Sequence, residues 1–131
     1  MTAHLFLFNM KVSELRIGNY INFCQGQDEY SKVDALNIYF FSKINKKFLD
    51  GIIEPIPITE EILLNCGFKM FGDLWKHKNL VTVHFMKNVG VSLMGVNNIK
   101  CWARCSHCYK NVHELQNLYY ALTGEELTIT L

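Results

Sequence analysis

Alternating hydrophobic and polar positions predict strands in the first fifty residues. Residues 15–24 carry apolar side chains of one parity and predict a strand, with Gly18 suited to a bulge or turn. Residues 35–42, ALNIYFFS, are rich in β-branched and aromatic types and predict a second strand. An Asp-Gly pair at 50–51 is a hairpin signal before the short apolar stretch 52–53. This part of the chain is therefore expected to form a small sheet or partial barrel.

Two helices are indicated by their caps. The two prolines of residues 54–59 favour extended backbone, after which Thr59 can cap a short helix that ends at Gly67. Asn111 and Glu114 form a capping-box pattern that predicts a helix over 111–122, and Gly124 is suited to the C′ position after it. This second helix has one apolar stripe, made of Leu115, Leu118, Tyr119 and Leu122.

The pattern between these helices returns to period two. Residues 80–85 and 89–96 alternate apolar and polar types, and an Asn-Asn turn at 97–98 leads into 99–102. A meander of three or four antiparallel strands is predicted over 74–102. Residues 127–131, LTITL, are expected to close the chain as a last strand.

These elements define an α+β fold. The expected architecture is a small N-terminal β-sheet or partial barrel, a short connecting helix, and a C-terminal antiparallel meander covered by one helix. The 131 residues suit a single compact domain spanning 1–131, with 10–53 (β-rich) and 54–131 (α+β) as its candidate sub-units.

Composition narrows the class of protein. No apolar run approaches the ~20 residues of a membrane span, so no membrane association is expected. Five cysteines are an odd number, which favours reduced thiols and a cytoplasmic location. The formal charge is +1, but residues 69–110 hold seven basic groups and a single acid, Asp73. That segment is a candidate electropositive surface.

The basic segment also contains aromatic residues, and lysines beside aromatic rings are what a single-strand nucleic-acid binder requires. The alternative is a solvated sheet face above an aromatic core, which the single arginine of the segment favours. The candidate nucleic-acid-binding residues are Lys76, Lys78, Lys87, Lys100, Arg104 and Trp102.

Three cysteines, Cys101, Cys105 and Cys108, have the spacing C-x3-C-x2-C. Radical S-adenosylmethionine enzymes hold a four-iron cluster with this spacing. They need a large α/β barrel, however, and the pattern of this sequence does not predict one. With either His107 or His113 as the fourth ligand, the three thiols could instead bind zinc. Ordinary small core or loop thiols are the favoured interpretation, so no cofactor is expected.

Catalytic motifs are absent from the sequence, and we expect no enzymatic activity. The helix over 111–122 has a second face that bears Gln116, Asn117 and Tyr120. Because adjacent helical residues diverge by about 100°, Tyr119 and Tyr120 cannot both point into a core. This face is a candidate surface for an unknown protein partner or for self-association.

Three stretches, ELRIGNYI (14–21), EPIPITEEILLNCGF (54–68) and VHELQNLYYALTGEELTI (112–129), resemble a family of small proteins from Bacteroidetes, their phages and their mobile elements. The resemblance implies a bacterial, mobile-element setting and no known activity or site residue. The cysteine cluster occupies the place of an insertion relative to that family pattern. Family members start shortly before the first motif, so Met10 is expected to be the natural start.

Sequence reasoning therefore predicts a non-enzymatic accessory or interaction protein of a bacterial mobile element or phage. The alternative is a nucleic-acid-binding module that uses the basic and aromatic region 69–110. A zinc-binding protein that uses the cysteines of 101–108 is the third interpretation.

Overall fold

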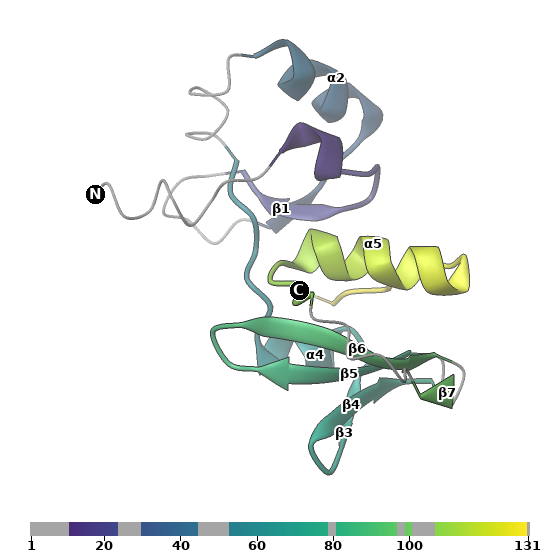
Figure 1. The fold of residues 1–131 in the computed structure, drawn as a ribbon. Helices are drawn as coiled ribbons and strands as arrows, with labels where there is room; N and C mark the ends of the chain where they lie inside the picture. The colour runs from purple at the N-terminus through teal and green to yellow at the C-terminus, as the bar shows by residue number, and fades with distance from the viewer. Residues whose placement is uncertain are drawn as a thin grey trace. The chain divides into compact units, whose positions relative to one another are not determined.

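The computed structural model describes residues 11–23, 30–44, 53–78, 81–96, 99–100 and 107–130. It confirms an α+β fold, with two antiparallel sheets, helices beside them and no closed barrel in this described part. The chain divides into two compact units, residues 1–56 and 57–131 (Figure 1). Among the described helices, none has the length and apolar character needed to cross a membrane.

The first unit contains a two-stranded sheet and a helix. Its elements are the 3-10 turn η1 (Val12–Glu14), strands β1 (Tyr20–Asn22) and β2 (Tyr30–Lys32), and helix α2 (Ala35–Lys43). β1 pairs antiparallel with β2, and its last residue, Asn22, also forms a bridge with Glu54. The predicted strand over 15–24 is thus confirmed only at 20–22, because Gly18 adopts a φ of +94° and turns the chain just before β1.

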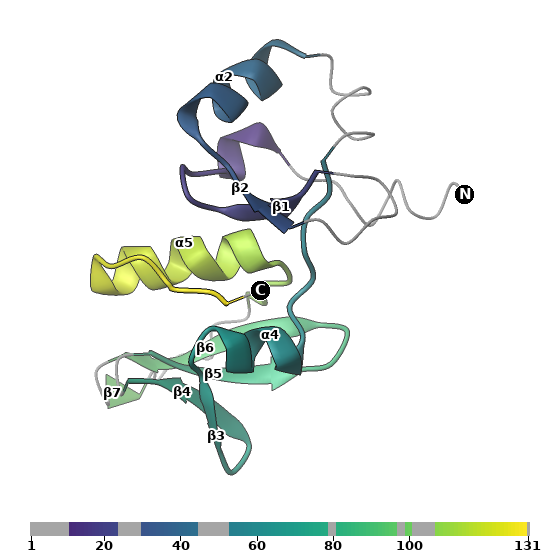
Figure 2. The same ribbon diagram turned by 180° about the vertical axis from the view of Figure 1, so that it is seen from behind.

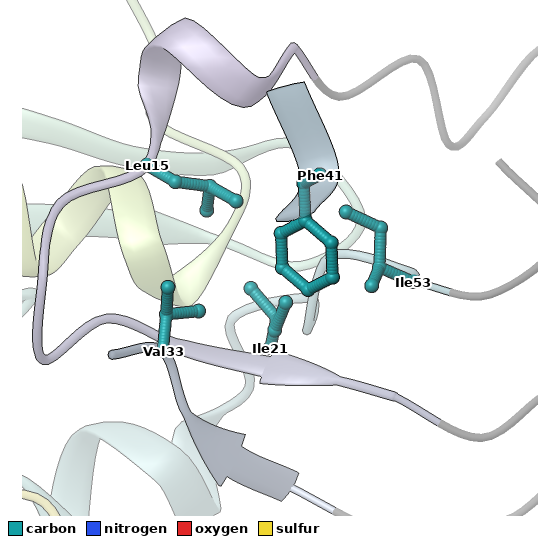
Figure 3. Packing of buried hydrophobic residues seen from close by; sticks show 5 residues of the cluster. All are labelled: Leu15, Ile21, Val33, Phe41 and Ile53. Carbon is teal, nitrogen blue, oxygen red and sulfur yellow. The ribbon is translucent and has the colours of Figure 1, made fainter. Parts of the chain in front are cut away.

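A hydrophobic cluster holds the first unit together. Figure 3 shows side chains that converge from the end of η1, from the strand pair, from α2 and from the segment that precedes Glu54. The buried members are Leu15, Ile21, Val33, Phe41 and Ile53. Phe23 packs on this cluster with its ring centroid 5.7 Å from that of Phe41.

The predicted strand over 35–42 is wrong, because this segment is α2. The Asp34 carboxylate accepts a hydrogen bond from the Asn37 backbone N–H (2.7 Å), and the Asn37 side-chain oxygen accepts one from the Asp34 N–H (3.0 Å). These reciprocal bonds satisfy the first turn's amide groups, which overrides the β-propensity of the aromatic and β-branched residues that follow. The hairpin predicted at 50–51 lies outside the described residues.

The second unit is a five-stranded antiparallel meander with two helices (Figure 2). Its elements are α4 (Glu60–Asn65), β3 (Lys69–Phe71), β4 (Leu74–His77), β5 (Val81–Met86), β6 (Gly90–Val96), β7 (Ile99–Lys100) and α5 (Val112–Thr123). The strands follow one another in sequence order across the sheet, which confirms the predicted meander and adds β3 to it.

The predicted caps of α4 are confirmed. The Thr59 hydroxyl accepts a hydrogen bond from the Ile62 N–H (3.2 Å) at the first turn. At the other end Gly67 has a φ of +92°, and the Phe68 N–H donates to the Leu63 carbonyl (3.0 Å). This is the Schellman arrangement, which folds Phe68 back into the core, where it is 1% exposed.

Helix α5 is also confirmed, with its boundaries set by the predicted residues. The Glu114 carboxylate accepts hydrogen bonds from the backbone N–H (3.2 Å) and side-chain amide (3.0 Å) of Asn111. Gly124 ends the helix in the left-handed region, with φ +75°. The interior of the helix is buried at Leu115 and Tyr119, as the apolar stripe predicts.

The last predicted strand is not formed over residues 127–130. Leu127 and Ile129 are buried and their neighbours are exposed, so the alternation is real. No strand is assigned there, however, and the Thr130 N–H instead donates to the carbonyl of Asn65 after α4 (3.1 Å). The segment therefore buries Leu127 and Ile129 but does not join a sheet.

Candidate functional site

A polar network lies inside the second unit at His77, which is 5% exposed. Its Nε2 is 2.9 Å from the Cys66 carbonyl oxygen, and its Nδ1 is 3.2 Å from the Tyr119 hydroxyl. A carbonyl can only accept, so Nε2 carries the proton and donates to Cys66. The Nδ1 of this neutral ring then accepts a hydrogen bond from Tyr119. The network joins the end of α4, strand β4 and helix α5.

The chemistry of this network is structural. Burial lowers the pKa of His77 below its usual 6.5, although the hydrogen bond to the Cys66 carbonyl opposes this shift. Burial raises the pKa of the Cys66 thiol to about 12 and also raises the pKa of Tyr119. The neutral His77 ring contacts the backbone carbonyl of Cys66, and a protonated thiol and a protonated phenol are not activated nucleophiles. We interpret these three residues as a satisfied buried network rather than a reaction centre.

The cysteine cluster falls mostly outside the described residues, which omit Cys101 and Cys105. Cys108 is half-buried, with its Sγ 3.3 Å from the Ser92 hydroxyl oxygen. His113 is fully buried in α5. Within the described ranges no three His, Cys, Asp or Glu side chains are grouped as metal ligands. Zinc binding by the complete cluster stays a prediction.

The basic candidates are distributed over the second unit's sheet. Lys76 lies in β4, Lys78 follows it with a φ of +48°, and Lys87 is exposed in the turn between β5 and β6. Lys100 is in β7 at a position paired with Gly95. Arg104 and Trp102 lie outside the described residues. Among these candidates, Lys76 has a ring contact in the described residues, with its Nζ 5.6 Å from the centroid of the Phe71 ring.

The predicted interaction face of α5 is only partly exposed. Tyr119 is 2% exposed and Tyr120 is 44% exposed, which confirms that the two rings diverge. Asn117 is half-buried. Gln116 is 1% exposed, which contradicts its placement on a surface face. Because Val112, His113 and Gln116 are buried as well as Leu115 and Tyr119, α5 is buried over a wider arc than its apolar stripe predicts.

A different exposed apolar face occurs on α2. Leu36, Tyr39 and Phe40 are 70%, 61% and 60% exposed, while Phe41 on the other side of the helix is 5% exposed. The exposed residues are spaced i, i+3 and i+4, so they form one patch. Lys43 continues this face at i+7, with its Nζ 5.6 Å from the centroid of the Tyr39 ring.

Sequence reasoning missed the α2 face because it treated 35–42 as a strand. The signal that could have found it is the Asp-x-x-Asn pattern of residues 34–37, which begins a helix. Once helical, a segment that is apolar all round has to be buried on every side or to expose an apolar face.

Comparison of the chain with protein-family models, with curated proteins and with solved structures found no significant match.

Proposed function

We propose that the chain is a non-enzymatic accessory protein that acts by protein contact, and that α2 makes this contact. The observation that carries the proposal is the exposed α2 face formed by Leu36, Tyr39 and Phe40. Apolar anchors at i, i+3 and i+4 are the pattern by which a helix docks in a groove of another protein. Exposed apolar side chains gathered in one patch mark interaction sites, whereas single ones do not.

The size of this face favours a partner with a groove over a second copy of the chain. Aromatic side chains bury roughly 150–250 Å² each, so the three partly exposed side chains present roughly 300–400 Å². Two such faces packed together would bury less than the roughly 1,000 Å² that a specific interface needs. A groove that encloses α2 covers the flanks of the helix as well.

The charge of the face indicates the chemistry of that groove. Lys43 stands at the C-terminal end of the face, over the ring of Tyr39. A partner groove lined by apolar side chains, with a carboxylate near this end, would match both features. We propose that the α2 face docks into such a groove of the partner.

The cellular setting is part of the same proposal. The resemblance of three stretches to proteins of Bacteroidetes mobile elements and phages supports an accessory role in such an element. The odd number of cysteines supports a reducing, cytoplasmic location. In the described residues, the neutral His77 and the protonated Cys66 support binding rather than catalysis.

Photo-crosslinking in the host cell tests the proposal. A benzophenone side chain replaces Tyr39 in one protein and the exposed Lys11 in a control protein. We expect position 39 alone to capture one host or element protein, and excess wild-type chain to suppress the product. Excess Phe40→Glu chain should not suppress it. Crosslinks only between copies of this chain, or equal suppression by both competitors, would contradict the proposal.

A further inference from the structure

The second unit carries a row of directly opposed positions that crosses all five strands of its sheet. Lys69 in β3 lies opposite Lys76 in β4, and Lys76 lies opposite Thr82 in β5. Thr82 is paired with Gly95 in β6, and Gly95 is paired with Lys100 in β7. Neighbouring strands are about 4.8 Å apart, so the row spans roughly 19 Å.

The side chains that the structure describes in this row, Lys69, Lys76 and Thr82, belong to the open face of the sheet. Directly opposed residues share a face, and side chains alternate between faces along each strand. The residues that flank the row on β4 and β5, Trp75, Val81 and Val83, are 4% exposed or less and form the core side. Figures 1 and 2 show that the loop joining β3 and β4 points away from α5, so the hairpin projects from the covered part of the unit.

Two lysines directly opposite each other need an explanation. Like charges at directly opposed positions destabilise an antiparallel pair. The one acidic residue between residues 69 and 110 is Asp73, in the turn beyond this pair. A row of positive charge maintained at a cost in stability fits an anion that bridges neighbouring lysines.

An aromatic ring lies beside the same pair. Phe71 shares the face of Lys69 and is 57% exposed. The Nζ of Lys76 is 5.6 Å from the centroid of this ring. An exposed ring flanked by lysines offers a stacking surface next to a phosphate-binding charge.

We propose that this open face binds single-stranded nucleic acid, with phosphates along the lysine row and a base stacked on Phe71. This site is centred on the β3–β4 hairpin. It includes Lys69 and Phe71 in addition to the candidate residues that the sequence indicates. It is independent of the α2 contact, which uses a different unit of the chain.

The exposed ring of Phe71 favours single-stranded nucleic acid over other polyanions. An acidic peptide or an anionic membrane surface would use the lysines alone, and duplex DNA keeps its bases stacked on one another. Unpaired bases are what an exposed ring can stack with, and this stacking tolerates any base.

Fluorescence anisotropy with a labelled oligothymidylate of about 16 nucleotides tests the proposal. We expect the wild-type chain to bind it more tightly than the matching duplex and more tightly than polyglutamate. Phe71→Ala should weaken binding about 5-fold or more, and Phe71→Tyr should retain it. Lys69→Gln together with Lys76→Gln should lower the slope of log affinity against log salt by about 1.4.

Two further variants separate binding from folding. Lys11→Gln, in the first unit, removes the same charge and should leave binding unchanged. Lys69→Glu places opposite charges face to face, so it should raise the unfolding midpoint while it weakens binding at least 10-fold. Equal affinity for polyglutamate, or an affinity for oligothymidylate that Phe71→Ala and Lys69→Glu leave unchanged, would overturn the proposal.

Discussion

At the scale of single residues, the contacts of His77 form a buried polar network inside the second unit. Its Nε2–H donates to the Cys66 carbonyl, and its Nδ1 accepts from Tyr119, so both ring nitrogens are satisfied. Its ring also packs edge-on against Phe68, with 5.1 Å between the ring centroids. Because a buried polar group costs little only when its hydrogen bonds are made, each member of this network depends on the others.

The hydroxyl of Tyr119 should therefore matter to stability although no reaction uses it. Tyr119→Phe leaves the buried Nδ1 of His77 without its donor, and we expect a loss of about 1–3 kcal/mol in the free energy of unfolding. Urea unfolding followed by circular dichroism measures it. The matched control is Tyr39→Phe, on a ring that is 61% exposed, which should change stability by less than about 0.5 kcal/mol.

The lowered pKa of His77 predicts a pH dependence with a definite sign. Above the ordinary histidine value of 6.5 the ring is neutral in both states, so the full stability is present. As the pH falls below 6.5, the unfolded chain binds a proton that the folded chain resists, and stability decreases toward the lower folded pKa. We expect His77→Gln to show a smaller loss of stability than the wild type as the pH falls below 6.5. Identical pH profiles for the two proteins would count against a neutral, buried His77.

At the scale of elements, capping residues allowed the ends of two helices to be predicted from the sequence. Thr59, Gly67, Asn111 and Gly124 each stand where a helix begins or ends, and the structure confirms all four. Their side-chain hydrogen bonds or left-handed backbone angles are local, so the sequence reveals them directly.

Composition or alternation alone led to two wrong strands. Residues 35–42 have strand composition but follow an Asp34 cap, and 127–130 alternate without joining a sheet. β3 was missed because its three residues are all exposed and show no alternation. The open-face lysine row depends on the register of five strands, and the α2 face depends on a helix, so neither candidate site could be read from spacing alone.

Because residues 35–43 form a helix, substitutions of the neighbouring residues Phe40 and Phe41 should differ in their cost to stability. Phe41→Ala removes a buried ring from the first unit's core and should cost about 3–5 kcal/mol, whereas Phe40→Ala should cost less than about 0.5 kcal/mol.

The cap of this helix gives a second check. Asp34→Ala removes the carboxylate that accepts from Asn37 and should cost about 1 kcal/mol. The exposed Asp73→Ala serves as its control. Thermal or urea unfolding measures all these variants, and a harmless Asp34→Ala would contradict the capping box.

At the scale of the whole molecule, the two units present different surfaces. The first exposes an apolar helix face with one lysine at its end, and the second exposes a lysine row beside an aromatic ring. The two proposed surfaces lie on different units of the chain, so substitutions can test each of them separately.

The thiols of the whole chain provide an independent test of the zinc interpretation. Burial keeps Cys66 protonated, so it should resist alkylation until the chain unfolds, whether or not metal is present. If Cys101, Cys105 and Cys108 bind zinc, elemental analysis should find about one ion per chain, and chelation alone should expose these three thiols. Free reaction of all three without chelation, in a zinc-free protein, would leave the cluster as ordinary thiols.

The most direct test of the central claim is a calorimetric titration of the purified protein captured through position 39. We predict that Phe40→Glu binds it at least about tenfold more weakly than the wild type, because an apolar anchor is replaced by a charge. Lys11→Gln, which lies off the α2 face, should bind as the wild type does. An affinity that Phe40→Glu leaves unchanged would contradict the assignment of α2 as the contact element.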